Sequence, residues 1–400
     1  MLVADGDRSM SSGLVGLRLR TCNDPGHCLV HRCVGWFRWP QHVLTTRVAS
    51  PDRREARMLG GRRLAHGIVA VVTAALATAA LGTPPAAASG NHGPQPVRLI
   101  FDTDFGGDVD DAGAAAMLNA MQDDGKVRVL AMMTSNLTRW AAPGLDAINT
   151  YYRHGNIPIG ALRPGYDDPD NNNLSTYAEH LATSYPNNVR DSSRVPEAVD
   201  LYRKLLAKQP DHSVVIAVVG GQTNLAQLLA SAPDRHSRLS GAQLVAKKVH
   251  HVVAMGAQFP AGFEWNIRLD PAAAATVAER WPTPVIYSGF EVGDSIYTGR
   301  QLFFETPPSN PVRAAYELYV GFGNNRESWD ITAVYYAVLG GQGMFGLSEP
   351  GTVNFAPDGS NTWTPTPGAD RYYLRTTVAD SEIASELEEW MIQPPERRGH

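Results

Sequence analysis

Apolar runs of strand character alternate with helix-like runs from residue 97 onward. This alternation predicts an α/β fold in which helices cover both faces of a mostly parallel sheet. The run 214–219 is wholly apolar, as is typical of a strand buried on both faces, and the apolar side chains of 195–208 recur at helical spacing. The remaining strands are predicted near 99–101, 127–134, 157–160, 250–256 and 284–289, and the remaining helices at 112–121, 141–152, 225–230, 331–338 and 380–391, with one more beginning at Asp270 and Pro271.

Residues 163–193 interrupt the alternation. They are rich in Asp, Asn, Pro and Tyr and show no sustained period, which predicts a long loop. A loop of this length is unusual in a compact domain, so we expect it to be either functional or mobile.

The first predicted strand ends in an acidic loop that runs straight into a helical pattern. Five aspartates fall between residues 102 and 111, and the pair Gly106 and Gly107 lets the chain turn sharply between them. Ligands of open α/β sheets bind beyond the carboxyl ends of the strands, which places this loop at a site. Crowded carboxylates raise one another's pKa unless a cation or a polyhydroxyl ligand compensates them, and their hard oxygens suit Ca²⁺ or Mg²⁺. The simpler interpretation is a solvated turn in which Asp110 or Asp111 caps the helix.

Four further polar positions stand at predicted strand ends or helix starts. Glu264 and Asn266 are two residues apart on a segment that we predict to be extended, so they would point to the same side. Asn224 could instead cap the helix that follows it. The four positions are Ser135 with Asn136, Thr223 with Asn224, Glu264 with Asn266, and Asp330.

Composition limits the partners of the chain. The 400 residues carry a formal net charge of −5, and the body of the chain contains no run rich in Lys and Arg. Nucleic acid is therefore excluded as an expected partner. The sequence gives no oligomeric state, and both a homodimer and a homotetramer stay open.

The first ninety residues are predicted to lie outside the fold. Residues 1–57 are Arg-rich and hold all three cysteines, and we expect them not to belong to the native product. Residues 58–89 combine a charged start, an apolar run and an Ala-rich end, which predicts a signal peptide beginning near Met58 and a secreted or extracytoplasmic protein without stable membrane association. A membrane anchor over 64–81 and a zinc cluster at the cysteines are the alternatives considered. The single large domain is predicted at 97–393, and it would contain no disulfide.

The motifs of this domain resemble those of the inosine-uridine-preferring nucleoside hydrolase family. That family opens with a strand and a DTDxGxDD-type loop, which is similar to Asp102–Asp111 with two extra residues. Its G-x-x-T-N turn looks like Gly220–Asn224, and its E-F-N-x-x-x-D-P stretch looks like Glu264–Pro271. The resemblance covers about residues 97–340 and implies a Rossmann-like nucleoside hydrolase fold.

The resemblance also implies roles for individual residues. Ca²⁺ would be bound by the carboxylates of Asp104, Asp111 and Asp330 and by the main-chain carbonyl of Thr223. Asp104 would also be the general base on a water molecule. The ribose hydroxyls would be bound by Asp110, Glu264 and Asn266, and Asn136 would contact the sugar or stabilise the site.

These roles fit calcium-dependent hydrolysis of the N-glycosidic bond of a ribonucleoside or a related N-riboside. The reaction passes through an oxocarbenium-like state, which needs nearby negative charge, a bound sugar and an activated water molecule.

Two features depart from the family pattern. Asp108 and Asp110 compete for one ribose-binding role, and Trp329 stands where many members carry a histidine that protonates the leaving base. Trp329 could stack on a base or pack in the core, but it cannot deliver a proton.

Two other functions remain alternatives. An exported protein could bind a sugar or nucleoside through calcium without turning it over. A phosphatase of the haloacid dehalogenase type also begins with a strand and an Asp-x-Asp loop, but it needs a Thr or Val where Gly106 stands and a phosphate-binding Lys that the mid-chain turn lacks.

Overall fold

The computed structural model describes residues 95–163 and 176–396. The segments predicted as an upstream region and a signal peptide lie outside these residues, so those predictions stay untested. Within the described ranges, no helix has both the length and the apolar character that crossing a membrane requires.

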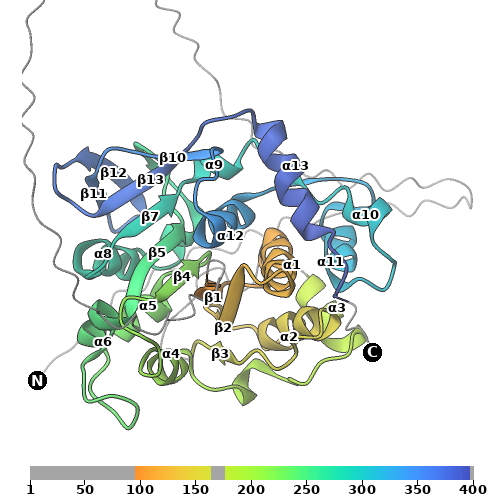
Figure 1. Ribbon diagram of the computed structural model, residues 1–400, viewed down its shortest axis with the longest axis horizontal. Coiled ribbons are helices and arrows are strands. Elements are labelled where there is room, and N and C mark those ends of the chain that lie inside the picture. Colours follow the sequence, from red (N-terminus) through yellow and green to blue (C-terminus); the bar gives the residue numbers. More distant parts are fainter. Residues whose placement is uncertain (1–94, 164–175, 397–400) are drawn as a thin grey trace, which may run out of the picture. The chain divides into compact units, whose positions relative to one another are not determined.

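The core of the fold is a sheet whose central strands run in parallel (Figure 1). Each of them pairs in parallel with its neighbours in the order β3-β2-β1-β4-β5-β7. These strands are β1 (Val97–Thr103), β2 (Val127–Thr134), β3 (Ile159–Ala161), β4 (Val214–Val218), β5 (Val249–Met255) and β7 (Val285–Ser288). The predicted parallel sheet is therefore confirmed, with each predicted strand within a few residues of its observed bounds.

A mixed extension continues the sheet beyond β7. There β13 (Arg371–Thr376) is parallel to β7, and β11 (Gly351–Phe355), β12 (Ser360–Pro365) and β6 (Ala261–Phe263) follow in antiparallel pairing, with β10 (Phe345–Leu347) also paired to β13. Strand β11 alternates buried and exposed residues and carries Thr and Asn at the exposed positions, so it shows no apolar run. A separate two-stranded sheet joins β8 (Tyr297–Thr298) to β9 (Arg326–Glu327).

Helices cover both faces of the sheet, and each face has its own hydrophobic core (Figure 1). Alternate residues of β1 enter the two cores: Leu99 and Phe101 enter one, and Ile100 enters the other. The first core is covered by α1 (Asp110–Asp123), α2 (Ala141–Tyr151), α3 (Tyr177–Ser184), α11 (Pro311–Val320), α12 (Trp329–Leu339) and α13 (Asp380–Met391). The second is covered by α4 (Ala198–Leu206), α5 (Thr223–Ala230), α6 (Gly241–Lys248), α7 (Trp265–Leu269) and α8 (Pro271–Arg280).

Residues 164–175 of the loop predicted over 163–193 lie outside the described residues, and the prediction is wrong for part of the rest. Helix α3 lies within it, and the 3₁₀ turn η1 (Ser192–Arg194) begins at its end. Tyr177, Ala178 and Leu181 form the buried face of α3, but the helix is too short for its spacing to stand out among the surrounding polar residues. The predicted cap at Asp270 is confirmed, because its side chain accepts a hydrogen bond of 3.0 Å from the backbone N–H of Ala273, with Pro271 in the first turn.

Candidate functional site

A cavity of about 370 Å³ brings together most of the residues that the sequence singled out. The predicted residues that line it are Asp104, Asp108, Asp110, Asp111, Glu264, Asn266, Trp329 and Asp330. They come from the end of β1, the start of α1, the β6–α7 junction and the start of α12. The other two predicted residues, Asn136 and Thr223, are buried beside these segments but do not line the cavity.

The loop between β1 and α1 is fixed by hydrogen bonds from two side chains to its backbone. The amide nitrogen of Asn136 donates to the carbonyl oxygens of Asp104 (2.6 Å) and Phe105 (2.7 Å). The hydroxyl of Tyr177 accepts from the N–H of Gly106 (2.8 Å) and donates to the carbonyl of Asp108 (2.7 Å). Asn136 therefore holds the acidic loop in place, and among the described residues it is not one that lines the cavity. Sequence reasoning missed Tyr177, because it lies inside the segment predicted as a loop.

The turn between β4 and α5 approaches the acidic loop closely. A Cβ atom on Gly220 would lie 2.6 Å from the backbone nitrogen of Asp104 and 2.7 Å from Oγ of Ser135, so only glycine fits there. Thr223 begins α5 two residues after Gly221, and its hydroxyl donates to the Asp270 carboxylate at 2.8 Å. The family-type turn thus packs directly against the residue expected to be the general base.

Asn224 does not cap α5, contrary to the simpler interpretation. Its amide nitrogen donates to both carboxylate oxygens of Asp102, at 3.0 and 3.2 Å, and the hydroxyl of Tyr202 donates to Asp102 at 2.8 Å. Burial raises the pKa of Asp102 to about 7, although these hydrogen bonds oppose the shift. This buried network ties the end of β1 to the start of α5, and so it fixes the two segments that meet at Gly220.

The acidic residues at the start of α1 and α12 are almost completely buried. Burial, together with the charges of neighbouring aspartates, raises the pKa of Asp110, Asp111 and Asp330 well above the usual range. The backbone N–H of Asp330 donates to Asp110 (2.9 Å), and the hydroxyl of Thr103 donates to one oxygen of Asp111. Within the described part of the chain, the other oxygen of Asp111 has no hydrogen-bond partner. The Arg326 charge opposes the shift of Asp110, but burial and the neighbouring aspartates outweigh it, so the cluster is only partly compensated.

Arg326 gives the two candidates for the ribose-binding aspartate, Asp108 and Asp110, different surroundings. Its guanidinium binds both oxygens of Asp108, with Nε at 2.9 and 3.0 Å, and it also contacts Glu327 at 2.8 Å. Asp108 is thus occupied by a direct ion pair, whereas Asp110 lines the cavity and feels the Arg326 charge only as an opposing influence on its raised pKa. No local signal in the sequence could have identified Arg326, because it lies 218 residues after its partner.

Glu264 does not lie on an extended segment with Asn266, so that prediction is wrong. The carboxylate of Glu264 caps the short helix α7 and accepts from the N–H groups of Asn266 (2.8 Å), Ile267 (3.1 Å) and Ala257 (3.2 Å). Both residues still line the cavity, because the cap turns the first residues of α7 toward it. Burial raises the pKa of Glu264 to about 7. The amide nitrogen of Asn266 donates to the carbonyl of Val219 at 2.9 Å, which links α7 to the end of β4.

An aromatic wall closes another side of the cavity. Its members are Trp265, Phe290, Tyr319 and Trp329. The indole nitrogen of Trp329 donates to the carbonyl of Phe290 at 2.9 Å, and the two rings stack with centroids 5.5 Å apart. A Cβ on Gly293 would lie 2.5 Å from Cα of Trp329, so this glycine allows α9 (Phe290–Gly293) to approach the start of α12. Trp329 is therefore held in one orientation at the cavity wall.

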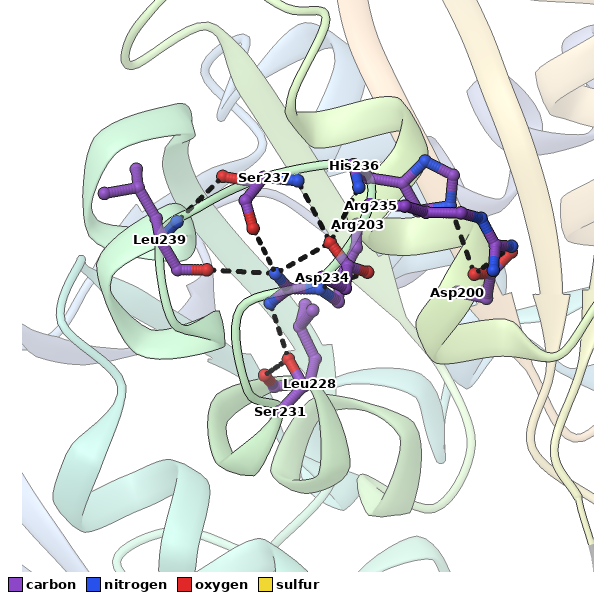
Figure 2. Close-up of polar contacts among 9 residues, drawn as sticks. All are labelled: Asp200, Arg203, Leu228, Ser231, Asp234, Arg235, His236, Ser237 and Leu239. Atoms are coloured by element: carbon purple, nitrogen blue, oxygen red, sulfur yellow. Dashed lines mark hydrogen bonds and ion pairs between the residues drawn. The ribbon is translucent and has the colours of Figure 1, made fainter.

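A second acidic group lies away from this cavity. Among the described residues, Asp200, Asp234 and His236 bring ligand atoms within 4.8 Å of one another, which the predicted calcium ligands do not do. Arg203 binds the carboxylate of Asp234 at 2.8 and 3.1 Å, and Arg235 binds Asp200 at 2.6 Å (Figure 2). Because guanidinium groups already neutralise these carboxylates, the group is an ion-pair network.

The fold and the cavity together define an α/β protein with a carboxylate-lined ligand site. The chain belongs to the inosine-uridine preferring nucleoside hydrolase family, whose model matches residues 99–358. The predicted family is thus confirmed, and the haloacid dehalogenase alternative is wrong.

Individual relatives are distant. The pyrimidine-specific ribonucleoside hydrolase RihA of Citrobacter koseri is 35% identical over 100 residues, which is 24% of this chain and only 28% of that protein. A plant nucleoside hydrolase, PpNRh1, superposes with a TM-score of 0.54 at 19% identity and covers 75% of this chain and 100% of its own. The inosine-uridine preferring nucleoside hydrolase of Bacillus anthracis gives a TM-score of 0.54 at 17% identity, over 74% of this chain and 99% of its own. At these identities the structural likeness concerns the fold.

Proposed function

We propose that the chain hydrolyses the N-glycosidic bond of ribonucleosides or of a related N-riboside. The observation that carries this proposal is the cavity itself, in which carboxylates from α1, α12 and the β6–α7 junction surround one space. Cleavage of an N-riboside builds positive charge on the sugar, so a wall of carboxylates stabilises the transition state more than the substrate.

We further propose that Asp104, Asp111 and Asp330, with the main-chain carbonyl of Thr223, bind a calcium ion. All four donors are hard oxygens, which Ca²⁺ prefers. The unpartnered oxygen of buried Asp111 and the raised pKa values of Asp111 and Asp330 both fit a group that a cation would compensate. When bound, the ion would supply Lewis acidity to a water molecule in the cavity.

Asp104 is the proposed general base. It follows directly after β1, it is half-buried at the cavity wall, and Asn136 and Gly220 fix its backbone from two sides. A base whose backbone is already fixed loses little conformational entropy when it takes the proton of the attacking water. Asn136 acts through Asp104 and is a positioning residue.

The ribose hydroxyls would bind to Asp110, Glu264 and Asn266. Glu264 lines the cavity and already accepts from backbone N–H groups, so a ribose hydroxyl would share its carboxylate oxygens with them. Asn266 donates through its nitrogen, so its side-chain oxygen is the atom that can accept from the sugar. Asp108 is assigned to Arg326 and not to the sugar.

Export through the segment 58–89 is part of the proposal, and it rests on the sequence pattern alone. Sequencing the N-terminus of the protein recovered outside the cytoplasm tests it. A start before Met58 would contradict it.

Release of free ribose and base from ribonucleosides tests the proposed function. With calcium, we expect turnover that a chelator abolishes and that added calcium restores. The Asp104→Asn variant should lose about 10²-fold or more in kcat, because removing a general base typically costs that much. Calorimetric binding of a nucleoside that depends on calcium but gives no release would support the alternative, a binding protein without turnover.

A further inference from the structure

Tyr177, the first residue of α3, is fully buried and does not line the cavity, yet it contacts the acidic loop at two backbone positions. Its hydroxyl accepts from the N–H of Gly106 at 2.8 Å and donates to the carbonyl of Asp108 at 2.7 Å. Both distances are those of well-formed hydrogen bonds. One side chain thus bridges the two ends of the turn formed by residues 106–108.

The backbone of this turn is intrinsically flexible. It contains two glycines in succession, and Gly106 has a φ of +115°, which residues with a Cβ rarely adopt. The backbone hydrogen bond from the N–H of Gly107 to the carbonyl of Asp104 is 3.4 Å long, beyond the usual range for such bonds. Glycine loses more conformational freedom on ordering than any other residue, so a contact from outside the turn contributes strongly to its order.

The charges of the acidic loop favour its opening when no metal ion is bound. Its carboxylates repel one another when they are ionised. The guanidinium of Arg326 pairs directly with Asp108 and offsets part of this repulsion. The carboxylates of the loop and of the helix start that follows it are Asp104, Asp108, Asp110 and Asp111.

Side chains oppose this opening at different parts of the loop. At its start, the amide nitrogen of Asn136 donates to the carbonyl of Asp104. At its end, the hydroxyl of Thr103 donates to the carboxylate of Asp111. Tyr177 holds the middle, where the two glycines make the backbone most flexible.

Helix α3 also supports the turn through packing. The ring of Tyr177 lies edge-on to Phe105, with centroids 5.2 Å apart. A Cβ atom added to Gly106 would lie 3.3 Å from Cβ of Ala178, so the turn lies directly against the helix. The same tyrosine ring meets Tyr319 of the aromatic wall, with centroids 6.4 Å apart. Tyr177 therefore connects the acidic loop to the wall of the cavity.

We propose that Tyr177 is a positioning residue that keeps the acidic loop closed before calcium binds. The inference rests on the proposed calcium site and goes beyond it, since Tyr177 would touch neither the ion nor the substrate. The proposed ligands Asp104 and Asp111 lie on either side of the turn that Tyr177 bridges, so the ion binds the closed loop. The apparent affinity for calcium therefore depends on the fraction of calcium-free chains in which the loop is closed.

The variant Tyr177→Phe tests this role, because it removes the hydroxyl and keeps the ring. In the calcium-free protein, we expect hydrogen exchange at residues 104–109, measured by mass spectrometry, to accelerate about 2- to 10-fold, the equivalent of one hydrogen bond's net contribution. Calorimetric titration should give a Kd for calcium that is about 10-fold higher, the lower end of the range for groups that orient metal ligands. Added calcium should slow the exchange again in both proteins.

Two further variants complete the test. Tyr287→Phe is the matched control: Tyr287 is also fully buried, and within the described residues its hydroxyl has no hydrogen-bond partner, so neither the exchange nor the Kd should change. Gly106→Ala reaches the same turn without altering the tyrosine. Its Cβ would be strained at a φ of +115° and would crowd Ala178, so the Kd for calcium should rise here too. This variant keeps the inference testable if Tyr177→Phe does not fold.

The outcomes separate this inference from the proposed calcium site. An unchanged Kd in Tyr177→Phe, or in Gly106→Ala if the first variant does not fold, would overturn the inference and leave the calcium site standing. Equal increases of the Kd in Tyr177→Phe and Tyr287→Phe would also overturn it, because they would reveal a general loss of stability. If the unsubstituted protein binds no calcium, the calcium site itself is wrong, and the inference falls with it.

Discussion

Asp108 and Asp110 are separated by one residue, yet the structure gives them different environments. Asp108 binds the guanidinium of Arg326 and is partly open to solvent, whereas Asp110 is 1% exposed and accepts the N–H of Asp330. The sequence could not distinguish them, because both fall in the same acidic run and the deciding partner lies far along the chain. It did identify the acidic loop, Glu264, Asn266 and Asp330, since each of these follows a local pattern.

Paired substitutions at these two aspartates give a direct prediction. Asp110→Asn should lower kcat/KM by about 10²-fold or more, because it removes a negative charge that faces the developing cation. Asp108→Asn should lower it by less than about fivefold, the worth of a partly exposed ion pair. Steady-state kinetics on both variants measure the difference. A larger loss in Asp108→Asn than in Asp110→Asn would show that the assignment is reversed.

At the scale of elements, the site depends on how closely two turns approach each other. The β4–α5 turn touches the β1–α1 loop at Gly220, and the Asp102–Asn224 hydrogen bonds tie the same two segments together. The apolar runs of the parallel strands predicted that these two segments lie together, because the carboxyl ends of parallel strands share one edge of the sheet. Strand β11 alternates buried and exposed residues and β12 is mostly polar, so neither carries such a run and their pairing could be found only in three dimensions.

Two neighbouring glycines provide a matched test of this contact. In Gly220→Ala the new Cβ would meet the backbone nitrogen of Asp104 at 2.6 Å, so we expect a loss of about 1–3 kcal/mol of stability and weaker calcium binding. In Gly221→Ala the nearest atom, Cβ of Leu269, is 3.5 Å away, an ordinary contact, so little change is expected. Urea unfolding and calcium titration measure both quantities. Similar behaviour of the two variants would mean that the close approach does not control the site.

At the scale of the whole molecule, buried acids make stability depend on pH and on metal together. The raised pKa values of Asp110, Asp111 and Asp330 mean that the folded chain without metal binds more protons than the unfolded chain above about pH 4. Its free energy of unfolding therefore falls as the pH rises. Asp102 and Glu264, both with a pKa of about 7, act in the same direction between about pH 4 and 7.

Calcium should offset this loss, because it replaces the protons on these carboxylates. We expect calcium at about 100 times its Kd to add about 2.7 kcal/mol at pH 8 and clearly less at pH 5 for the same concentration. Thermal unfolding with calcium or with a chelator at both pH values measures this difference. Asp330→Asn serves as the control and should lose most of the calcium effect. An equal effect of calcium at pH 5 and pH 8 would contradict the expectation.

Two sides of the cavity are supported by different parts of the chain, as the pairing of β6 with β12 shows. Phe263 is in register with Ser360, so the wall beside Glu264 is supported by a hairpin from the C-terminal part of the chain, while Asp104 to Asp111 are supported by the parallel strands. We expect insertions or exchanges in that hairpin to reshape the wall beside Glu264 and to leave the acidic loop in place. The fold thereby allows the wall that would select a substrate to change while the proposed general base keeps its position.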